Sequence, residues 1–224
     1  MLSRPRSNDS RGFTLIELLI VVAIIAIVAV LAIPTMSAAQ VDRRVFTDAG
    51  FVGELFRVAR TRAVGRGAAV LVKLTATSSG GGGTFSMYEA VAANPSGGGS
   101  AEVPSSSCKS PTRWPGANGT LGTDYEFIDA VNLSGAYEIQ NSIAAQVKDP
   151  SGNVLASGTD AFLCFTPGGR IYYVATTPTF DNVTPLGGAI QIDVRRFNGG
   201  FATAVGLTRT VWVTSSGSTR IVSQ

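Results

Sequence analysis

Glu17 is the acidic side chain whose position most needs a chemical explanation, because it lies inside a long apolar run. The run begins at Phe13, and residues 18–33 contain no charged or polar side chain. At about 1.5 Å per residue, such a run forms a helix of about 30 Å, the thickness of the hydrocarbon core of a bilayer. A carboxylate at the centre of a membrane helix costs roughly 2.5–3.5 kcal/mol, so an acid in this setting indicates a function.

The rest of the chain offers few groups for catalysis. Its 224 residues include no His, which excludes a Ser/His/Asp triad, a Cys/His dyad and most zinc sites. The glycine runs lack the Lys-Ser/Thr pair of a phosphate-binding loop. Asp124, Glu126 and Asp129 form a close group of carboxylates that could hold Ca²⁺, although a solvated strand edge is the commoner case. We therefore expect no enzyme, no metal and no cofactor.

The apolar run has three interpretations on composition alone. Arginines at positions 4, 6 and 11 precede it, as in a secretory signal peptide, and Ser37-Ala38-Ala39 could supply a cleavage site. A simple signal anchor, with Glu17 reaching to the interface, is the second interpretation. The third is a functional acid that belongs to the mature protein.

Residues 11–17, with the sequence Arg-Gly-Phe-Thr-Leu-Ile-Glu, favour the third interpretation. They resemble the class III signal of type IV pilins and type II secretion pseudopilins. The resemblance implies that a prepilin peptidase cuts after Gly12 and methylates the new amino terminus at Phe13, while the apolar helix stays on the mature chain. It also implies that Glu17 pairs with the Phe13 amine of a neighbouring subunit during filament assembly.

The resemblance divides the chain into four parts. These are a leader peptide at 1–12, the transmembrane half of the N-terminal helix at 13–34, its amphipathic half at 35–67 and an extracytoplasmic β-rich domain at 68–224. Pro34 is expected to kink the helix. Because basic residues stay in the cytoplasm, the chain should cross the bacterial inner membrane once, with a cytoplasmic N-terminus and a periplasmic C-terminal domain. It would later enter a pilus or a pseudopilus.

The amphipathic half has apolar residues at intervals of three and four, which places them on one helix face: Val45, Ala49, Val52, Phe56, Ala59 and Ala63. This face should pack on the sheet, and Gly65 and Gly67 should end the helix. The helix also carries four closely spaced arginines, Arg57, Arg60, Arg62 and Arg66. They either form a solvated face or contact acidic neighbours or DNA.

The remaining part, about 150 residues, is long enough for one globular domain with a core. Strand patterns are expected at residues 68–77, 85–91, 125–131, 136–143, 161–166, 170–175, 189–197, 207–214 and 218–222, with a long Pro/Gly/Ser-rich loop at 94–123. The predicted fold class is α+β and pilin-like, with one long N-terminal helix packed on a C-terminal antiparallel β-sheet.

Cys108 and Cys164 are the two cysteines of the chain. A domain outside the cytoplasm permits a disulfide, and closing a loop of nearly 60 residues would stabilise the fold by roughly 4 kcal/mol. We favour the bridge over the alternative of two buried free thiols.

A second resemblance concerns the end of the helix and the later strands. Residues 59–67 are similar to the helix end of GspH/FimT-type minor pseudopilins and minor pilins, but Arg62 stands where that group usually has Glu. Residues 165–170 are similar to its late hairpin, and Trp212 begins a stretch similar to its C-terminal strands. The resemblance implies a structural subunit at or near the tip of a type IV pilus or type II secretion pseudopilus, serving protein secretion or pilus biogenesis.

The partners implied are the prepilin peptidase, other pilins or pseudopilins, the inner-membrane assembly platform and, before assembly, membrane lipid. The alternative function is DNA uptake, because some FimT-like members bind DNA through basic residues near the C-terminus. Here residues 217–220 lack one arginine of the Gly-Arg-x-Arg motif. The arginines that could form a phosphate-binding patch are Arg195, Arg196, Arg209 and Arg220. A net charge of +3 does not by itself imply nucleic acid.

Overall fold

The computed structural model describes residues 13–75, 83–92, 103–109, 125–133, 142–156, 159–175, 183–198 and 203–223. The chain divides into two compact units, Met1–Val41 and Asp42–Gln224. The first contains the beginning of the long helix. The second contains the rest of the helix and all the strands.

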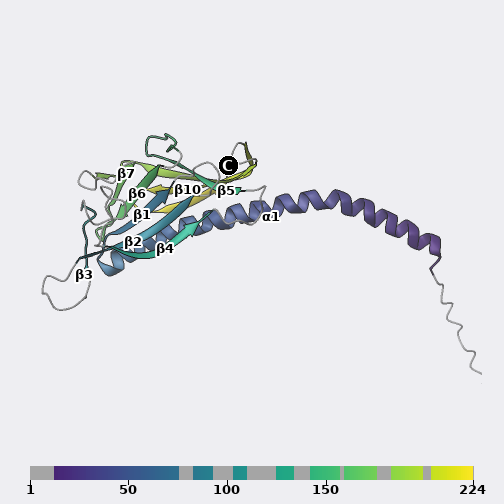
Figure 1. Cartoon of the computed structure of the whole chain (residues 1–224), viewed down its shortest axis with the longest axis horizontal. Coiled ribbons are helices and arrows are strands. Elements are labelled where there is room, and N and C mark those ends of the chain that lie inside the picture. The colour runs from purple at the N-terminus through teal and green to yellow at the C-terminus, as the bar shows by residue number, and fades with distance from the viewer. Residues whose placement is uncertain are drawn as a thin grey trace, which may run out of the picture. The chain divides into compact units, whose positions relative to one another are not determined.

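The helix α1 runs from Leu15 to Arg66 (Figure 1). The assignment continues without interruption through Pro34, so the kink expected there stays a prediction. Within the part of the chain that the structure describes, no helical segment has both the length and the hydropathy needed to cross a membrane.

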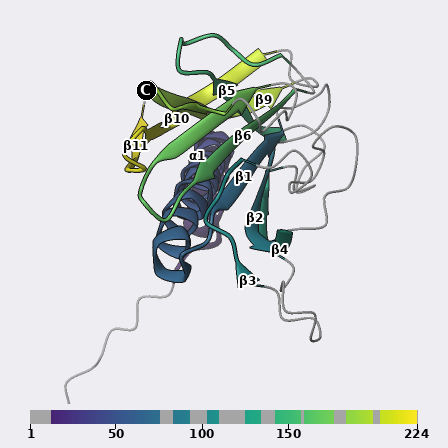
Figure 2. The ribbon, with the colours of Figure 1, turned by 90° about the vertical axis from the view of Figure 1, so that its left-hand side faces the viewer.

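The second unit contains strands that form two antiparallel sheets. The strands are β1 (Val70–Thr75), β2 (Thr84–Ala92), β3 (Val103–Pro104), β4 (Tyr125–Asn132), β5 (Ser142–Lys148), β6 (Asp160–Phe165), β7 (Ile171–Ala175), β8 (Thr184–Pro185), β9 (Ala189–Asn198), β10 (Thr203–Thr214) and β11 (Thr219–Ser223). One sheet has the order β3-β2-β1-β6-β7-β8, with β4 also paired to β2, and the other has the order β11-β10-β9-β5. Figure 2 shows both sheets beside α1. The predicted α+β fold is confirmed.

One face of α1 forms the centre of the core. The six apolar residues predicted from their spacing are all at most 1% exposed, from Val45 to Ala63. They pack in one cluster with residues from both sheets, such as Leu163 of β6 and Ile192 of β9. The helix ends at Arg66, and Gly67 follows with φ 67°, a conformation that glycine adopts without a steric penalty. The predicted core face is therefore confirmed.

Several strands differ from those expected. Most of the strand expected at 136–143 lies outside the described residues, because the structure does not describe 134–141; the strand β5 begins at Ser142 and continues to Lys148. The sequence of β5 combines two alanines with Gln146 and Lys148, so its intrinsic strand preference is weak and its pairing with β9 determines its place. Strand β10 begins at Thr203 rather than at 207, because a bulge between Val205 and Arg209 carries the ladder further.

The disulfide between Cys108 and Cys164 is present, with a Cα–Cα distance of 6.0 Å. Both cysteines are buried, in a second apolar cluster with Leu71 and Phe162. The segment that carries Cys108 is also fixed through Ser105, whose carbonyl oxygen accepts a hydrogen bond of 2.6 Å from the Ala69 amide. The predicted bridge is confirmed. Most of the expected loop at 94–123 lies outside the described residues.

Candidate functional site

The start of α1 carries the residues predicted for processing and assembly. Phe13 is 81% exposed and precedes the helix, whereas Glu17 lies in its first turn; Gly12 lies outside the described residues. The Glu17 amide donates a hydrogen bond of 3.3 Å to Thr14 Oγ1, and the Leu18 amide donates one of 3.2 Å to the Thr14 carbonyl oxygen. Thr14 is therefore the N-cap residue, and Thr14 and Glu17 have the spacing of a capping box.

This cap has two consequences for the chemistry at the amino terminus. Because the helix begins after Thr14, Phe13 lies before the helix and is not part of it. The carboxylate of Glu17 lies at the positive end of the helix dipole, which stabilises its negative charge. Sequence reasoning missed Thr14, although a Thr three residues before a Glu at the start of an apolar run is a recognisable cap signal.

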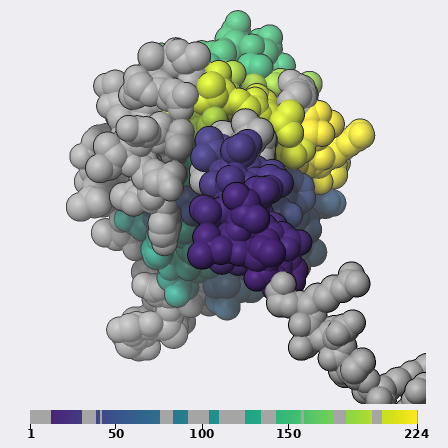
Figure 3. All heavy atoms as spheres, turned by 90° about the vertical axis from the view of Figure 1, so that its right-hand side faces the viewer, coloured from purple at the N-terminus to yellow at the C-terminus, as the bar shows by residue number. Residues whose placement is uncertain are grey.

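The apolar side chains that follow Glu17 are exposed in the first unit (Figure 3, purple). The exposed fractions of the large ones, among them Leu18 and Ile25, lie between 43% for Val21 and 70% for Val30. Surface of this size and composition is typical of a segment that is covered by lipid or by other protein chains.

Two arginines at the end of α1 bind a buried acid. Glu89 of β2 is 0% exposed, and its carboxylate forms ion pairs with Arg62 and, at 2.6 Å, with Arg66 Nε. Arg57 instead pairs with Glu54 at 3.1 Å on the exposed face of the helix. Of the alternatives left open for these arginines, an acidic neighbour within the same chain holds for Arg62 and Arg66. Arg62, which stands where the group described above usually has Glu, is thus an ion-pair partner of Glu89.

The four arginines considered for DNA contact do not share one face of their sheet. Side chains alternate along β9, where Ile192 and Val194 point into the core, so Arg196 lies on the core side and Arg195 on the opposite side. Arg209 lies opposite Val194 in the register and therefore also on the core side. There its guanidinium carbon stands 5.5 Å from the centre of the Phe46 ring.

Arg220 lies on the opposite side, together with Arg195. Arg220 lies opposite Trp212 of β10 in the register, so the two side chains are on the same side of the sheet. Thr210, two residues before Trp212, is on that side too, where its hydroxyl donates a hydrogen bond to Asp193. The four side chains thus form two separate pairs. A single phosphate-binding patch made of all four is not formed.

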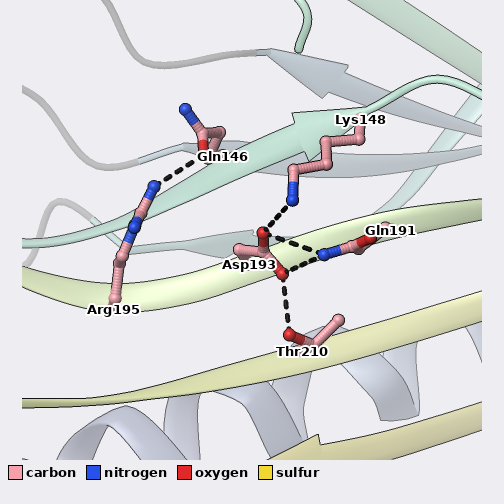
Figure 4. A network of polar contacts seen from close by, with 6 residues as sticks. All are labelled: Gln146, Lys148, Gln191, Asp193, Arg195 and Thr210. Atoms are coloured by element: carbon pink, nitrogen blue, oxygen red, sulfur yellow. Dashed lines mark hydrogen bonds and ion pairs between the residues drawn. The ribbon is translucent and has the colours of Figure 1, made fainter. Parts of the chain in front are cut away.

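The side of the sheet that carries Arg195 has a network around Asp193 (Figure 4). Asp193 is 4% exposed and accepts hydrogen bonds from Gln191 Nε2 at 2.8 and 3.0 Å and from Thr210 Oγ1 at 2.7 Å, and Lys148 Nζ lies 2.9 Å from its carboxylate. Burial raises the pKa of Asp193, but the hydrogen bonds and the positive charge of Lys148 outweigh burial and lower it below its usual value. Asp193 is therefore held as a carboxylate.

Arg195 joins the edge of this network. Its Nη2 donates a hydrogen bond of 2.6 Å to Gln146 Oε1, and its guanidinium carbon stands 5.3 Å from the centre of the Phe197 ring. These contacts fix the side chain without neutralising it. Across the described residues, no three acidic or cysteine side chains come together as metal ligands would.

Comparison with known proteins agrees with the N-terminal signal. Residues 7–33 match the prokaryotic N-terminal methylation motif. No curated protein sequence matches the chain. The crystal structure of the type IV minor pilin FimU from Pseudomonas aeruginosa is similar over 83% of this chain and 91% of that one, with 14% identity and a TM-score of 0.37.

The chain thus combines an N-terminal methylation motif, at the start of a long helix, with an antiparallel β-rich domain. The pilin-type signal predicted from residues 11–17 is confirmed by the match.

Proposed function

We propose that this chain is a minor pilin or pseudopilin, a structural subunit that assembles at or near the tip of a type IV pilus or a type II secretion pseudopilus. The observation that carries this proposal is the methylation motif at residues 7–33. It lies at the beginning of the helix whose later turns are built into the core of the β-rich domain. Removal of a leader would leave the apolar helix attached to that domain, as a filament subunit requires.

Processing would take place at the bond between Gly12 and Phe13. Hydrolysis by a prepilin peptidase releases residues 1–12 and creates an amine on Phe13, which stays positively charged when it is methylated. Thr14 then caps a helix that starts two residues after the new terminus, at Leu15. Nothing in this step needs a nucleophile or a cofactor from the chain itself, so its role is that of a substrate and a building block.

Assembly would use the carboxylate of Glu17. In the proposed filament, Glu17 accepts the positive charge of the Phe13 amine of a neighbouring subunit. Two opposite charges that meet in apolar surroundings offset part of the desolvation cost of each, and the pairing fixes the axial position of one subunit against the next. The exposed apolar residues around Glu17 would be covered first by lipid and then by neighbouring helices.

The proposed location follows from the same segment. Residues 13–34 would anchor the chain in the inner membrane with the N-terminus in the cytoplasm, and the β-rich domain would face the periplasm before assembly. The disulfide between Cys108 and Cys164 supports this placement, because that compartment allows disulfides to persist. The proposed partners are the prepilin peptidase, other pilins or pseudopilins and the inner-membrane assembly platform.

The assembly role is tested by comparing Glu17→Val with Glu54→Val. Both changes remove one exposed carboxylate from α1, but Glu54 pairs with Arg57 of its own chain. We expect Glu17→Val to be cut normally and to be missing from sheared filaments or pseudopili, while Glu54→Val is incorporated. Normal incorporation of Glu17→Val would refute the proposed pairing with the amine.

A further inference from the structure

Three arginines and one aromatic residue lie together where the second unit begins. Arg43 and Phe46 belong to the first turns of α1 in this unit, and Arg196 and Arg209 face the helix from β9 and β10. We call this group the basic collar. Arg44 is not part of it, because its charge acts on Asp48, where it opposes the rise in pKa that burial causes.

The sheet register brings Arg196 and Arg209 close together. Val194 lies opposite Arg209, and Arg196 follows Val194 on the same face, so the two arginines are diagonal neighbours. The helix approaches the bulge of β10 closely, because a Cβ atom at Gly206 would lie 2.9 Å from Asp42 Oδ1, and Gly206 has φ 78°. Glycine is needed at this position for the bulge and for the close contact.

Among the described residues, the arginines of the collar form no ion pair, although the acid Asp42 directly precedes Arg43 on the helix. Within the same part of the chain, neither Arg196 Nε nor Arg209 Nε has a hydrogen-bond partner, although both atoms are buried from solvent. A buried donor without a partner is unfavourable, and more so when it is charged, so an anion at this place would relieve a cost already present.

We propose that the basic collar binds the phosphate groups of anionic phospholipids while the subunit waits in the membrane. This inference rests on the proposed anchoring by residues 13–34. Arg43 follows Pro34, the last residue of the proposed anchor, by nine residues in the sequence, so the collar begins soon after the chain would leave the bilayer. Basic residues that follow a membrane segment this closely in the sequence are attracted by anionic headgroups at the membrane surface.

The aromatic member of the collar supports a membrane surface over a protein surface. Phe46 is 55% exposed and stacks with Arg209, so an apolar ring and a guanidinium group are presented side by side. Paired aromatic and basic side chains are typical of residues that contact lipid headgroups and the adjoining acyl chains. Acidic residues of a neighbouring subunit are the competing partner, and the experiment below separates the two.

The test titrates the full chain, in neutral detergent micelles, with phosphatidylglycerol or phosphatidylcholine and counts bound lipid by native mass spectrometry. One variant combines Arg196→Gln with Arg209→Gln. The matched control combines Arg170→Gln with Arg220→Gln, which removes the same charge from exposed positions outside the collar. Arg43→Gln changes an exposed side chain and keeps the test valid if the double variant does not fold.

The unaltered chain should prefer phosphatidylglycerol. An arginine near an anionic surface contributes roughly fivefold to binding, so the collar variant should bind it about 25-fold more weakly and Arg43→Gln about fivefold more weakly. The control should bind as the unaltered chain does. Equal binding of both lipids, or an equal loss in the control, would overturn the proposal. The proposal would also be overturned if a collar variant bound lipid as the unaltered chain does but co-purified with fewer neighbouring subunits.

Failure of the collar can be told apart from failure of the anchor. Extraction of isolated membranes at alkaline pH releases a chain that has no membrane-spanning segment. If the unaltered chain is released, the anchoring in the proposed function is wrong. If the chain is retained but shows no preference for anionic lipid, only the collar proposal is wrong.

Discussion

Replacing both Arg62 and Arg66 by methionine should destabilise the β-rich domain far more than either single change. Glu89 is fully buried, and these two side chains are the ones that form ion pairs with it within the described residues. Removing the partner of a buried charge costs about 3–5 kcal/mol, because the remaining charge stays desolvated. Methionine keeps the apolar length of the side chain and suits a helix, so the loss reports mainly the charge.

The size of the two single effects follows from exposure. Arg62 is 28% exposed and Arg66 is 51% exposed, so Arg62 provides the better shielded contact and its loss should be the larger. After either substitution, the other arginine still forms an ion pair with the Glu89 carboxylate. We therefore expect each single variant to lose about 1–2 kcal/mol and the double variant to lose more than their sum, as coupled neighbours do.

Chemical denaturation of the full chain in detergent, followed by tryptophan fluorescence, measures these losses. Arg57→Met is the control, since its pair with Glu54 is more than half exposed on both sides and should contribute less than about 1 kcal/mol. The reasoning is refuted if the double variant loses no more stability than this control, or if the two single losses simply add.

Two further predictions concern the two sheets. Replacing Cys108 and Cys164 together by serine should lower the free energy of unfolding by roughly 4 kcal/mol, because the bridge closes a loop with a sequence separation of 56, and a loss below about 1 kcal/mol would contradict this. Asp193 has a pKa below its usual value in the folded chain, so it contributes stability above its unfolded pKa that is lost as pH falls through the folded pKa. Denaturation between neutral and acidic pH should therefore show a smaller acid loss in Asp193→Asn than in the unaltered chain; equal losses would contradict the assignment.

The features that could be predicted from the sequence are those set by local spacing. The buried face of α1 follows from intervals of three and four, and the processing signal follows from Gly12, Phe13 and Glu17 beside an apolar run. The disulfide between Cys108 and Cys164 follows from a chain with two cysteines whose β-rich domain the sequence predicts to lie outside the cytoplasm. Each of these features can be predicted without knowing which strands pair.

The features that could not be predicted depend on partners far apart in the chain. Glu89 meets Arg62 and Arg66 only because the β1–β2 hairpin folds back along the helix end. Strand β5 is defined by its pairing with β9 rather than by its own residues. The separation of Arg195 from Arg196 could have been predicted, because consecutive residues of a strand point to opposite faces. The inward position of Arg209 needed the register of β9 and β10.

The central claim, that the chain is a processed filament subunit, is tested most directly by its amino terminus. Intact mass and N-terminal sequencing of the protein recovered from membranes, with and without a co-expressed prepilin peptidase, give the cut site. A processed filament subunit should be methylated and begin at Phe13, with residues 13–34 retained, only when the peptidase is present. Cleavage after the apolar run, independent of that peptidase, would contradict this claim and make the protein a secreted β-rich domain.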